Sequence, residues 1–203
     1  AASSTDQISL LKSVDQKYQG AQSVVMNAKK ITKGGVFDQL EESEGMLYVQ
    51  KGKLRLEVQN KEKEKSLVVA DGSYVWLVTP PPAEFKSAKT QVVKAPMSNK
   101  KASSQGLLKI LSEGGILKYF KITSVKSEAS QSIYMLKPLK ESPELTKAEL
   151  TLDSKEKQIA ALKYWDSVEN ETGYQFSKVK FNEKVDKGLF QYTPPANANV
   201  VTP

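Results

Sequence analysis

The stretch from position 45 to 78 alternates between apolar and polar residues, and this pattern predicts antiparallel strands. Leu54, Leu56 and Val58 each follow a charged or polar residue. Because successive side chains of a strand point to opposite faces, the alternation predicts one apolar and one charged face. The pair Asp71-Gly72 lies between two apolar runs and predicts a hairpin, since glycine adopts the positive φ that such turns need. The pattern is typical of an antiparallel sheet with one covered face.

Two segments predict helices that can cover this face. In residues 4–20, apolar side chains recur at helical spacing, at Ile8, Leu11, Val14 and Tyr18. Residues 102–112 predict a second, short helix, which Gly114-Gly115 ends. Its apolar side chains include Leu107, Leu108, Ile110 and Leu111. Ordinary packing against the sheet and a role as a lid both fit these two helices.

The rest of the chain predicts strands bounded by turns. They are expected over residues 21–32, 36–44 (an edge or outward-facing strand), 120–125, 131–137, 145–152, 158–168, 173–182 and 188–193. Strands at this even spacing indicate one continuous antiparallel barrel or half-barrel rather than βαβ units. We therefore expect a mainly β fold with a few helices, in a single domain over residues 1–203.

The chain contains no cysteine and no histidine. Their absence excludes thiol catalysis, Ser-His triads, proton transfer by histidine and zinc sites of the Cys/His type. Asp71, Asp153 and Asp166 fall at predicted turns or strand ends, where carboxylates are common for local reasons. We therefore predict a protein that is not an enzyme and that has no metal site and no cofactor.

The net charge of +7 raises the question of nucleic-acid binding. The positive charge is almost entirely lysine, spread evenly along the chain, and Arg55 is the only arginine. Base readout and phosphate binding favour arginine, so we predict no nucleic-acid partner. No apolar run approaches the 18 or so residues that a membrane-spanning helix needs.

The order of these elements resembles the LolA family of periplasmic lipoprotein carriers. After the N-terminal helix comes Gly45-Met46-Leu47-Tyr48-Val49-Gln50-Lys51-Gly52-Lys53-Leu54-Arg55-Leu56-Glu57, where the family has a strand, a basic residue, Pro-Gly and a second strand. Val69-Ala70-Asp71-Gly72-Ser73-Tyr74-Val75-Trp76-Leu77 resembles the family's hairpin around Asp-Gly. Leu189-Phe190-Gln191-Tyr192-Thr193-Pro194-Pro195, followed by Val200-Val201, resembles its closing strand. The resemblance covers nearly the whole chain.

The chain departs from the family's pattern at four points. The proline of its Arg-Pro-Gly step is missing, and the arginine that latches the helical lid through backbone carbonyls falls on Lys51. Lysine has fewer donors and no planar fork, so a latch at Lys51 is expected to be weaker. The family's aromatic and tryptophan positions fall on Leu54 and Leu56, which keeps this surface apolar.

The resemblance implies an incomplete, half-open antiparallel β-barrel with an α-helical lid over its concave face. It also implies an apolar cavity for acyl chains, lined by Leu11, Val14, Leu54, Leu56, Val58, Trp76, Leu107, Leu108 and Leu111. The implied protein is a periplasmic monomer, a mature form without its signal peptide. Its implied partners are acylated lipoproteins, an inner-membrane lipoprotein-releasing ABC transporter and an outer-membrane acceptor.

Two alternatives share this fold. One is the LolB-type acceptor, which is anchored by a lipidated N-terminal cysteine. The other is a LolA-like sensory or regulatory domain that binds a lipid or a protein partner in the same cleft.

Overall fold

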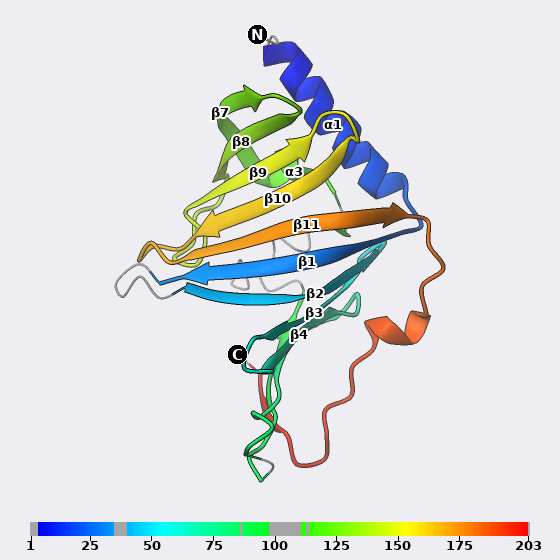
Figure 1. Ribbon diagram of the computed structural model, residues 1–203, viewed down its shortest axis with the longest axis vertical. Coiled ribbons are helices and arrows are strands. Elements are labelled where there is room, and N and C mark those ends of the chain that lie inside the picture. The colour runs from blue at the N-terminus through cyan, green and yellow to red at the C-terminus, as the bar shows by residue number, and fades with distance from the viewer. Residues whose placement is uncertain (1–3, 35–39, 86, 98–110, 113, 203) are drawn as a thin grey trace.

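The computed structural model describes residues 4–34, 40–85, 87–97, 111–112 and 114–202. Twelve strands form one sheet in the order β12-β6-β5-β4-β3-β2-β1-β11-β10-β9-β8-β7 (Figure 1). Every pair is antiparallel except the parallel pair of β12 with β6. The strands at the two ends of this order, β12 and β7, are not paired with each other in the described part of the chain, so the sheet stays open. The predicted half-open, mainly β architecture is confirmed.

The elements follow one another along the chain with these bounds. The helical elements are α1 (Ser4–Gly20), α3 (Ile116–Tyr119) and the 3₁₀ helix η1 (Lys187–Phe190). The first six strands are β1 (Ser23–Lys33), β2 (Leu40–Gln50), β3 (Lys53–Asn60), β4 (Lys65–Ala70), β5 (Tyr74–Thr79) and β6 (Gln91–Pro96). The second six are β7 (Phe120–Glu128), β8 (Gln131–Pro138), β9 (Lys147–Asp153), β10 (Gln158–Trp165), β11 (Glu171–Phe181) and β12 (Asn199–Val201).

The two faces of the sheet follow from the alternation in β3. Leu54, Leu56 and Val58 are buried on one face, here called the inner face, while Glu57 on the opposite, outer face is exposed. The predicted division into an apolar and a charged face is therefore confirmed. Directly paired residues of antiparallel strands share a face, so the register of the sheet assigns the faces of all other strands.

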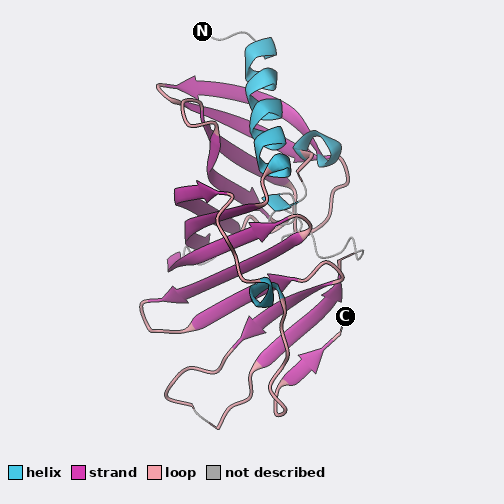
Figure 2. Cartoon of the chain, turned by 90° about the vertical axis from the view of Figure 1, so that its right-hand side faces the viewer, coloured by secondary structure: helices cyan, strands magenta, loops and turns pink. Residues whose placement is uncertain are grey.

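Helix α1 covers the inner face at the end of the sheet that carries β7 to β10 (Figure 1). Leu11, Val14 and Tyr18 are buried there, at the spacing of one helical stripe. Asp6 in the first turn and Lys17 in the last turn complement the helix dipole. Figure 2 shows α1 along the upper strands and η1 with the segment after it along the lower ones.

The pairing of β1 with β11 joins two distant parts of the chain. Val24 of β1 lies opposite Phe181 of β11, and the ladder continues to Lys33 opposite Glu171. On its other side β1 pairs with β2 along its whole length. This seam connects the strands β2 to β6 with the strands β7 to β11.

The strand predicted over residues 36–44 is confirmed in its described part, but its predicted position at the edge of the sheet is wrong. Residues 40–44 belong to β2, which lies between β1 and β3. The polar pattern arises because pairing with β3 begins only at Ser43, so the first residues of β2 are exposed. Gly45 then passes so close to β3 that a Cβ atom would lie 1.8 Å from the carbonyl oxygen of Glu57.

The predicted strand over residues 188–193 is also wrong. These residues form the end of η1 and an extended segment, and the last strand is β12. Asp186 caps η1 by accepting a hydrogen bond from the N–H of Gly188, 2.8 Å from Oδ1. Arg55 Nη1 then donates to the carbonyl oxygen of Leu189 at 3.0 Å, which holds the segment against the outer face.

Candidate binding face

The inner cluster is the apolar core between α1 and the inner face. Leu11 and Val14 of α1 are 1% and 0% exposed in it. Leu54, Leu56 and Val58 of β3 and Leu111 belong to the same cluster and are also buried. Six of the nine residues predicted to line the cavity are therefore brought together, as tightly packed side chains. Leu107 and Leu108 lie outside the described residues.

Polar contacts fix α1 above the strands β8 to β10. Tyr134 Oη donates to the carbonyl oxygen of Gln7 at 2.7 Å. The N–H of Ile159 donates to Tyr18 Oη at 3.0 Å, and Lys17 Nζ donates to the carbonyl oxygen of Glu156 at 2.9 Å. Both ends of α1 are thus tied to the sheet.

The Tyr18 hydroxyl is a buried acceptor. Ile159, whose N–H it binds, lies at an irregularity in the pairing of β10 with β9. Burial raises the pKa of Tyr18 to about 12, against the opposing effect of the Ile159 hydrogen bond. The phenol is therefore neutral across the physiological range, and its oxygen satisfies an N–H group that the ladder leaves free.

An apolar row crosses the inner face from β1 to β6. Register places its residues side by side in the order Met26, Leu47, Leu56, Val68, Leu77 and Val93, and we call them the transverse row. The first three are buried, whereas the last three are only partly buried. Apolar surface on the inner face thus becomes accessible toward β6, beyond the reach of α1.

The accessible end of the transverse row was not among the predicted site residues. Val68 and Leu77 pair directly across the hairpin that Asp71-Gly72 makes. The sequence could have indicated these residues, because the hairpin fixes the pairing of Val68 with Leu77. On its other side Val68 pairs with Leu56. A predicted register would have found the extension.

Trp76 does not belong to the inner face. It pairs with Val69, one residue out of step with the transverse row, so its side chain lies on the outer face. There it packs in what we call the outer cluster, made of Val69, Trp76, Val78 and Val92, with Leu67, Tyr192 and Ala198 against it. The assignment of Trp76 to the cavity wall is corrected accordingly.

Asp71 anchors the outer cluster from its hairpin. Its Oδ2 accepts a hydrogen bond from Trp76 Nε1 at 2.8 Å, and its Oδ1 accepts from the N–H groups of Ser73 and Tyr74. Burial alone would raise the pKa of Asp71, but these hydrogen bonds and the charge of Lys94 outweigh it and hold the pKa below its ordinary value.

The other two turn aspartates have similar local roles. Asp153 accepts from the N–H groups of Lys155 and Glu156, and Asp166 accepts from those of Val168 and Asn170. Each of these carboxylates is engaged by the backbone of its own turn. No group of acidic side chains with the geometry of a metal site occurs among the residues that the structure describes.

A hollow of about 720 Å³ opens where β1, β10 and β11 meet their turns. Thr32, Tyr164 and Thr172 line it, together with carboxylates that include Glu41 and Glu171. By register Thr32 and Thr172 are paired and lie on the inner face, so the hollow adjoins the inner face at the end of these strands.

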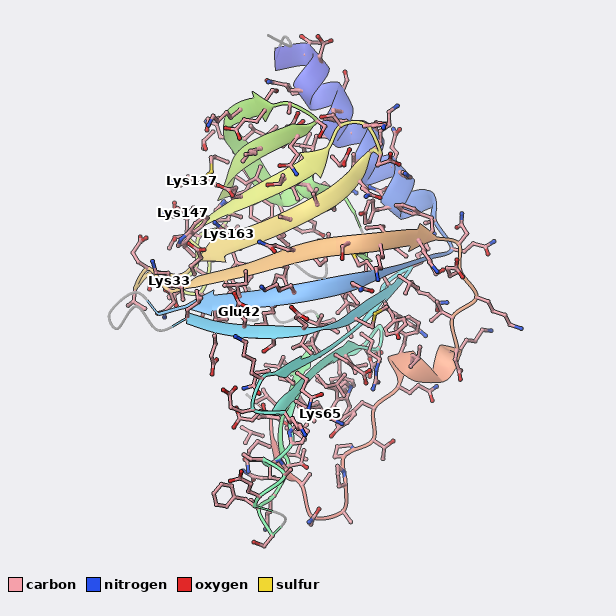
Figure 3. The ribbon with its side chains drawn as sticks, viewed as in Figure 1. Lys33, Glu42, Lys65, Lys137, Lys147 and Lys163 are labelled. Carbon is pink, nitrogen blue, oxygen red and sulfur yellow. The ribbon has the colours of Figure 1, made fainter. Side chains whose placement is uncertain are left out.

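Lysines lie around the same end of the sheet. Figure 3 shows Lys33, Lys137, Lys147 and Lys163 there. Carboxylate oxygens lie close to the lysine Nζ atoms in the pairs Lys137 with Glu141, Lys147 with Glu169 and Lys163 with Glu171, at 2.8, 3.4 and 3.4 Å. Much of the positive charge at this end is therefore locally balanced.

The predicted latch at Lys51 lies in the turn between β2 and β3. Its side chain is exposed and has no hydrogen bond or ion pair with the described residues. The neighbouring backbone makes the link instead, since the N–H of Gly52 donates to the carbonyl oxygen of Ser112 at 3.4 Å. Asp15 of α1 accepts the N–H of Gly115 at 2.7 and 2.8 Å from its two oxygens.

In the described part of the chain, no helix has the length and apolar character needed to cross a membrane.

Comparison with known protein families and sequences gives two matches. The sequence profile described as outer membrane lipoprotein carrier protein LolA matches residues 19–193. An outer-membrane lipoprotein carrier protein from Alcanivorax borkumensis is 23% identical over 137 residues, which are 68% of this chain and 61% of that protein's length.

One solved structure supports the fold, and a second also aligns over most of this chain. An uncharacterized conserved protein from Thermus thermophilus aligns over 98% of this chain and 99% of its own, with a TM-score of 0.52 at 13% identity. A LolA superfamily protein from Nitrosomonas europaea aligns over 94% and 99%, with a TM-score of 0.46 at 10% identity. Because the family profile spans most of the sequence, this chain belongs to the LolA family of outer membrane lipoprotein carrier proteins.

Proposed function

We propose that the protein is a periplasmic carrier that binds the acyl chains of lipoproteins on its inner face. In this proposal it takes lipoproteins from an inner-membrane ABC transporter and delivers them to an outer-membrane acceptor. The observation that carries the proposal is the accessible end of the transverse row, at Val68, Leu77 and Val93.

The physical basis is the burial of hydrocarbon. Each methylene group removed from water contributes about 0.8 kcal/mol, so a few methylenes on this row give useful affinity. Leu54 and Leu56, which are packed in the inner cluster with residues of α1, continue this apolar surface. Acyl chains that enter between the helices and the sheet would replace contacts that the empty protein makes with itself.

That competition favours release of the ligand. A cover that packs on the sheet in the empty state opposes the ligand and keeps its affinity moderate. The link from Gly52 to Ser112 is one such closing contact. Binding needs no catalytic group, which agrees with the carrier description of the family.

The test is uptake of a triacylated lipopeptide, followed by native mass spectrometry. The wild type is expected to bind it. Leu77→Glu places a charge on the accessible end of the row and is expected to weaken binding by about tenfold or more, because a charge resists contact with hydrocarbon. Gln175→Glu adds the same charge on the outer face and is the matched control.

Thermal unfolding of both variants shows whether they are folded. If the folded Leu77→Glu variant binds as well as the wild type, the transverse row is not the binding surface. If the wild type takes up no lipopeptide, the carrier function fails.

Transfer between membranes separates the carrier from the acceptor and regulatory alternatives. A carrier is expected to move lipoprotein from inner-membrane vesicles to outer-membrane vesicles. In the same assay Lys51→Ala tests the latch: unchanged transfer would remove any role of the Lys51 side chain.

A further inference from the structure

One lysine, Lys30, lies on the inner face between the apolar residues of β1 and the pair of Thr32 with Glu41. Register pairs Lys30 of β1 with Ser43 of β2 and with Tyr174 of β11. Two residues earlier on the same face is buried Ala28, and two residues before that is Met26, the first residue of the transverse row. Four residues of a strand span about 14 Å, so Lys30 lies within an acyl chain's length of that row.

Lys30 has no hydrogen bond or ion pair with any residue that the structure describes, and it is partly buried. Its neighbour Lys29 on the outer face differs, because its Nζ lies 2.9 Å from a carboxylate oxygen of Glu42. Burial lowers the pKa of Lys30, and the charge of Glu41, acting from beyond ion-pair distance, raises it in part.

The two residues paired directly with Lys30 carry no counter-charge, and the carboxylate of Glu41, opposite Thr32 on the same face, lies beyond ion-pair distance. Burial and the adjacent Tyr164 hold the pKa of Tyr174 well above its ordinary value, so this phenol stays neutral. Ser43 is uncharged. A partly desolvated ammonium group without a partner costs free energy, and an anion that binds it recovers that cost through charge-assisted hydrogen bonds.

The position of Lys30 suits a polar head group. The next inner-face residue along β1 is Thr32, which lines the open hollow together with Thr172 and Tyr164. The inner face thus passes from apolar residues, through Lys30, to a hollow of about 720 Å³ whose polar and charged lining includes the carboxylates Glu41, Glu144, Asp166 and Glu171. A bound amphiphile has the same order: hydrocarbon chains, then a charged head group that faces water.

We propose that Lys30 binds the anionic head group, phosphate or carboxylate, of an amphiphile whose acyl chains lie along the transverse row. This inference rests on the proposed function, because it assigns the head-group end of the same binding face. It makes anionic lipids and acidic acyl compounds a second class of ligand beside lipoproteins.

The test compares dioleoyl phosphatidic acid with dioleoylglycerol, which share both acyl chains and differ by one phosphate. Affinities are measured on the full chain by native mass spectrometry and by equilibrium titration below the aggregation concentration of the lipids. The wild type is expected to prefer phosphatidic acid by about tenfold, the usual scale of a charge-assisted contact. Inorganic phosphate is titrated in parallel as the anion without chains.

Three variants resolve the role of the residue. Lys30→Met is expected to lose the preference and keep its affinity for dioleoylglycerol, and Lys30→Arg is expected to keep most of the preference. Lys29→Met removes the same charge from the outer face and is expected to leave the preference unchanged.

The outcomes separate this inference from the proposed function. A wild type that binds both lipids equally, or a Lys30→Met variant that retains the preference, overturns the role of Lys30 and leaves the carrier proposal standing. A wild type that binds neither lipid and no lipopeptide overturns both. Inorganic phosphate binding as tightly as phosphatidic acid would overturn the amphiphile and identify free phosphate as the ligand.

Discussion

The inner and outer clusters lie on opposite faces of one sheet and overlap at β4 and β5. The inner cluster joins α1 to strands from β1 through β11, whereas the outer cluster joins four residues of β4 to β6 to the C-terminal segment. Where α1 covers the inner face, the apolar side chains of that face are buried. Where the C-terminal segment supports the outer face, the inner face leaves Val68, Leu77 and Val93 accessible. The comparison teaches that packing against the outer face can stabilise strands whose apolar inner face stays accessible.

The largest expected effect is a loss of unfolding free energy in the inner cluster. Leu11→Ala removes a fully buried side chain from the inner cluster and is expected to cost about 2 to 5 kcal/mol of unfolding free energy. Urea denaturation measures it. Ile8→Ala, on the same helix but 39% exposed, is the control and is expected to change stability by less than about 1 kcal/mol. Equal losses would mean that the inner cluster does not hold the fold.

The next effect tests the tie between α1 and β10. Tyr18→Phe leaves the N–H of Ile159 without its acceptor, which is expected to cost about 1 to 3 kcal/mol. Since the pKa is raised to about 12, the folded state keeps its proton where the unfolded state loses it. The wild type should therefore lose part of its stability as pH rises from about 10 to 12, and Tyr18→Phe should lose less. Parallel slopes in urea titrations across this range would contradict the assignment.

Asp71→Asn tests the outer cluster. Asparagine presents one acceptor oxygen, so one of the hydrogen bonds from Trp76, Ser73 and Tyr74 is lost, at an expected cost of about 1 to 2 kcal/mol near neutral pH. Because the pKa of Asp71 is held low, its stabilisation is present above about pH 4 and is lost as pH falls further. Asp71→Asn should remove this part of the acid slope, and Glu62→Gln on the exposed turn should not. An unchanged slope would rule out the anchoring role.

The smallest effect on global stability is expected from Tyr192→Ala. Tyr192 contacts Trp76 with ring centroids 5.6 Å apart, and the loss is expected to be about 1 kcal/mol. Hydrogen exchange should accelerate in β6 and β12 and remain unchanged in β8 to β10. Tyr119→Ala, at a tyrosine that is 46% exposed, is the control. Faster exchange throughout the sheet would show that the two clusters are one cooperative unit.

The sequence predicted the strands better than their faces. Strict alternation in β3 assigned Leu54, Leu56 and Val58 to one face, as found. The run from Val75 to Val78 is apolar on both faces, because β5 contributes Val75 to the inner cluster and Trp76 and Val78 to the outer cluster. No alternation in this run therefore indicated that Trp76 points outward. Only the pairing of Trp76 with Val69 shows on which face the Trp76 side chain lies. Such pairing depends on residues outside the strand itself.

The C-terminal segment shows the same limit. Residues 188–193 have strand-like composition, but they join no ladder, and Tyr192 packs against the outer cluster instead. The sequence did not indicate a binding role for Lys30 for a related reason. One lysine among several in β1 is typical of a solvent-exposed face. Its place became visible only when Ser43 and Tyr174 were found opposite it.

The seam between β1 and β11 has a consequence for folding kinetics. Val24 pairs with Phe181, nearly the whole chain away, whereas β2 to β6 and β7 to β11 each pair mainly with sequence neighbours. Contacts between distant residues must close long loops and therefore form slowly. Two local meanders are expected to assemble first and the seam last. Until the chain has reached Phe181, β1 exposes one unpaired edge, so a chaperone that binds strand edges would have its longest opportunity there.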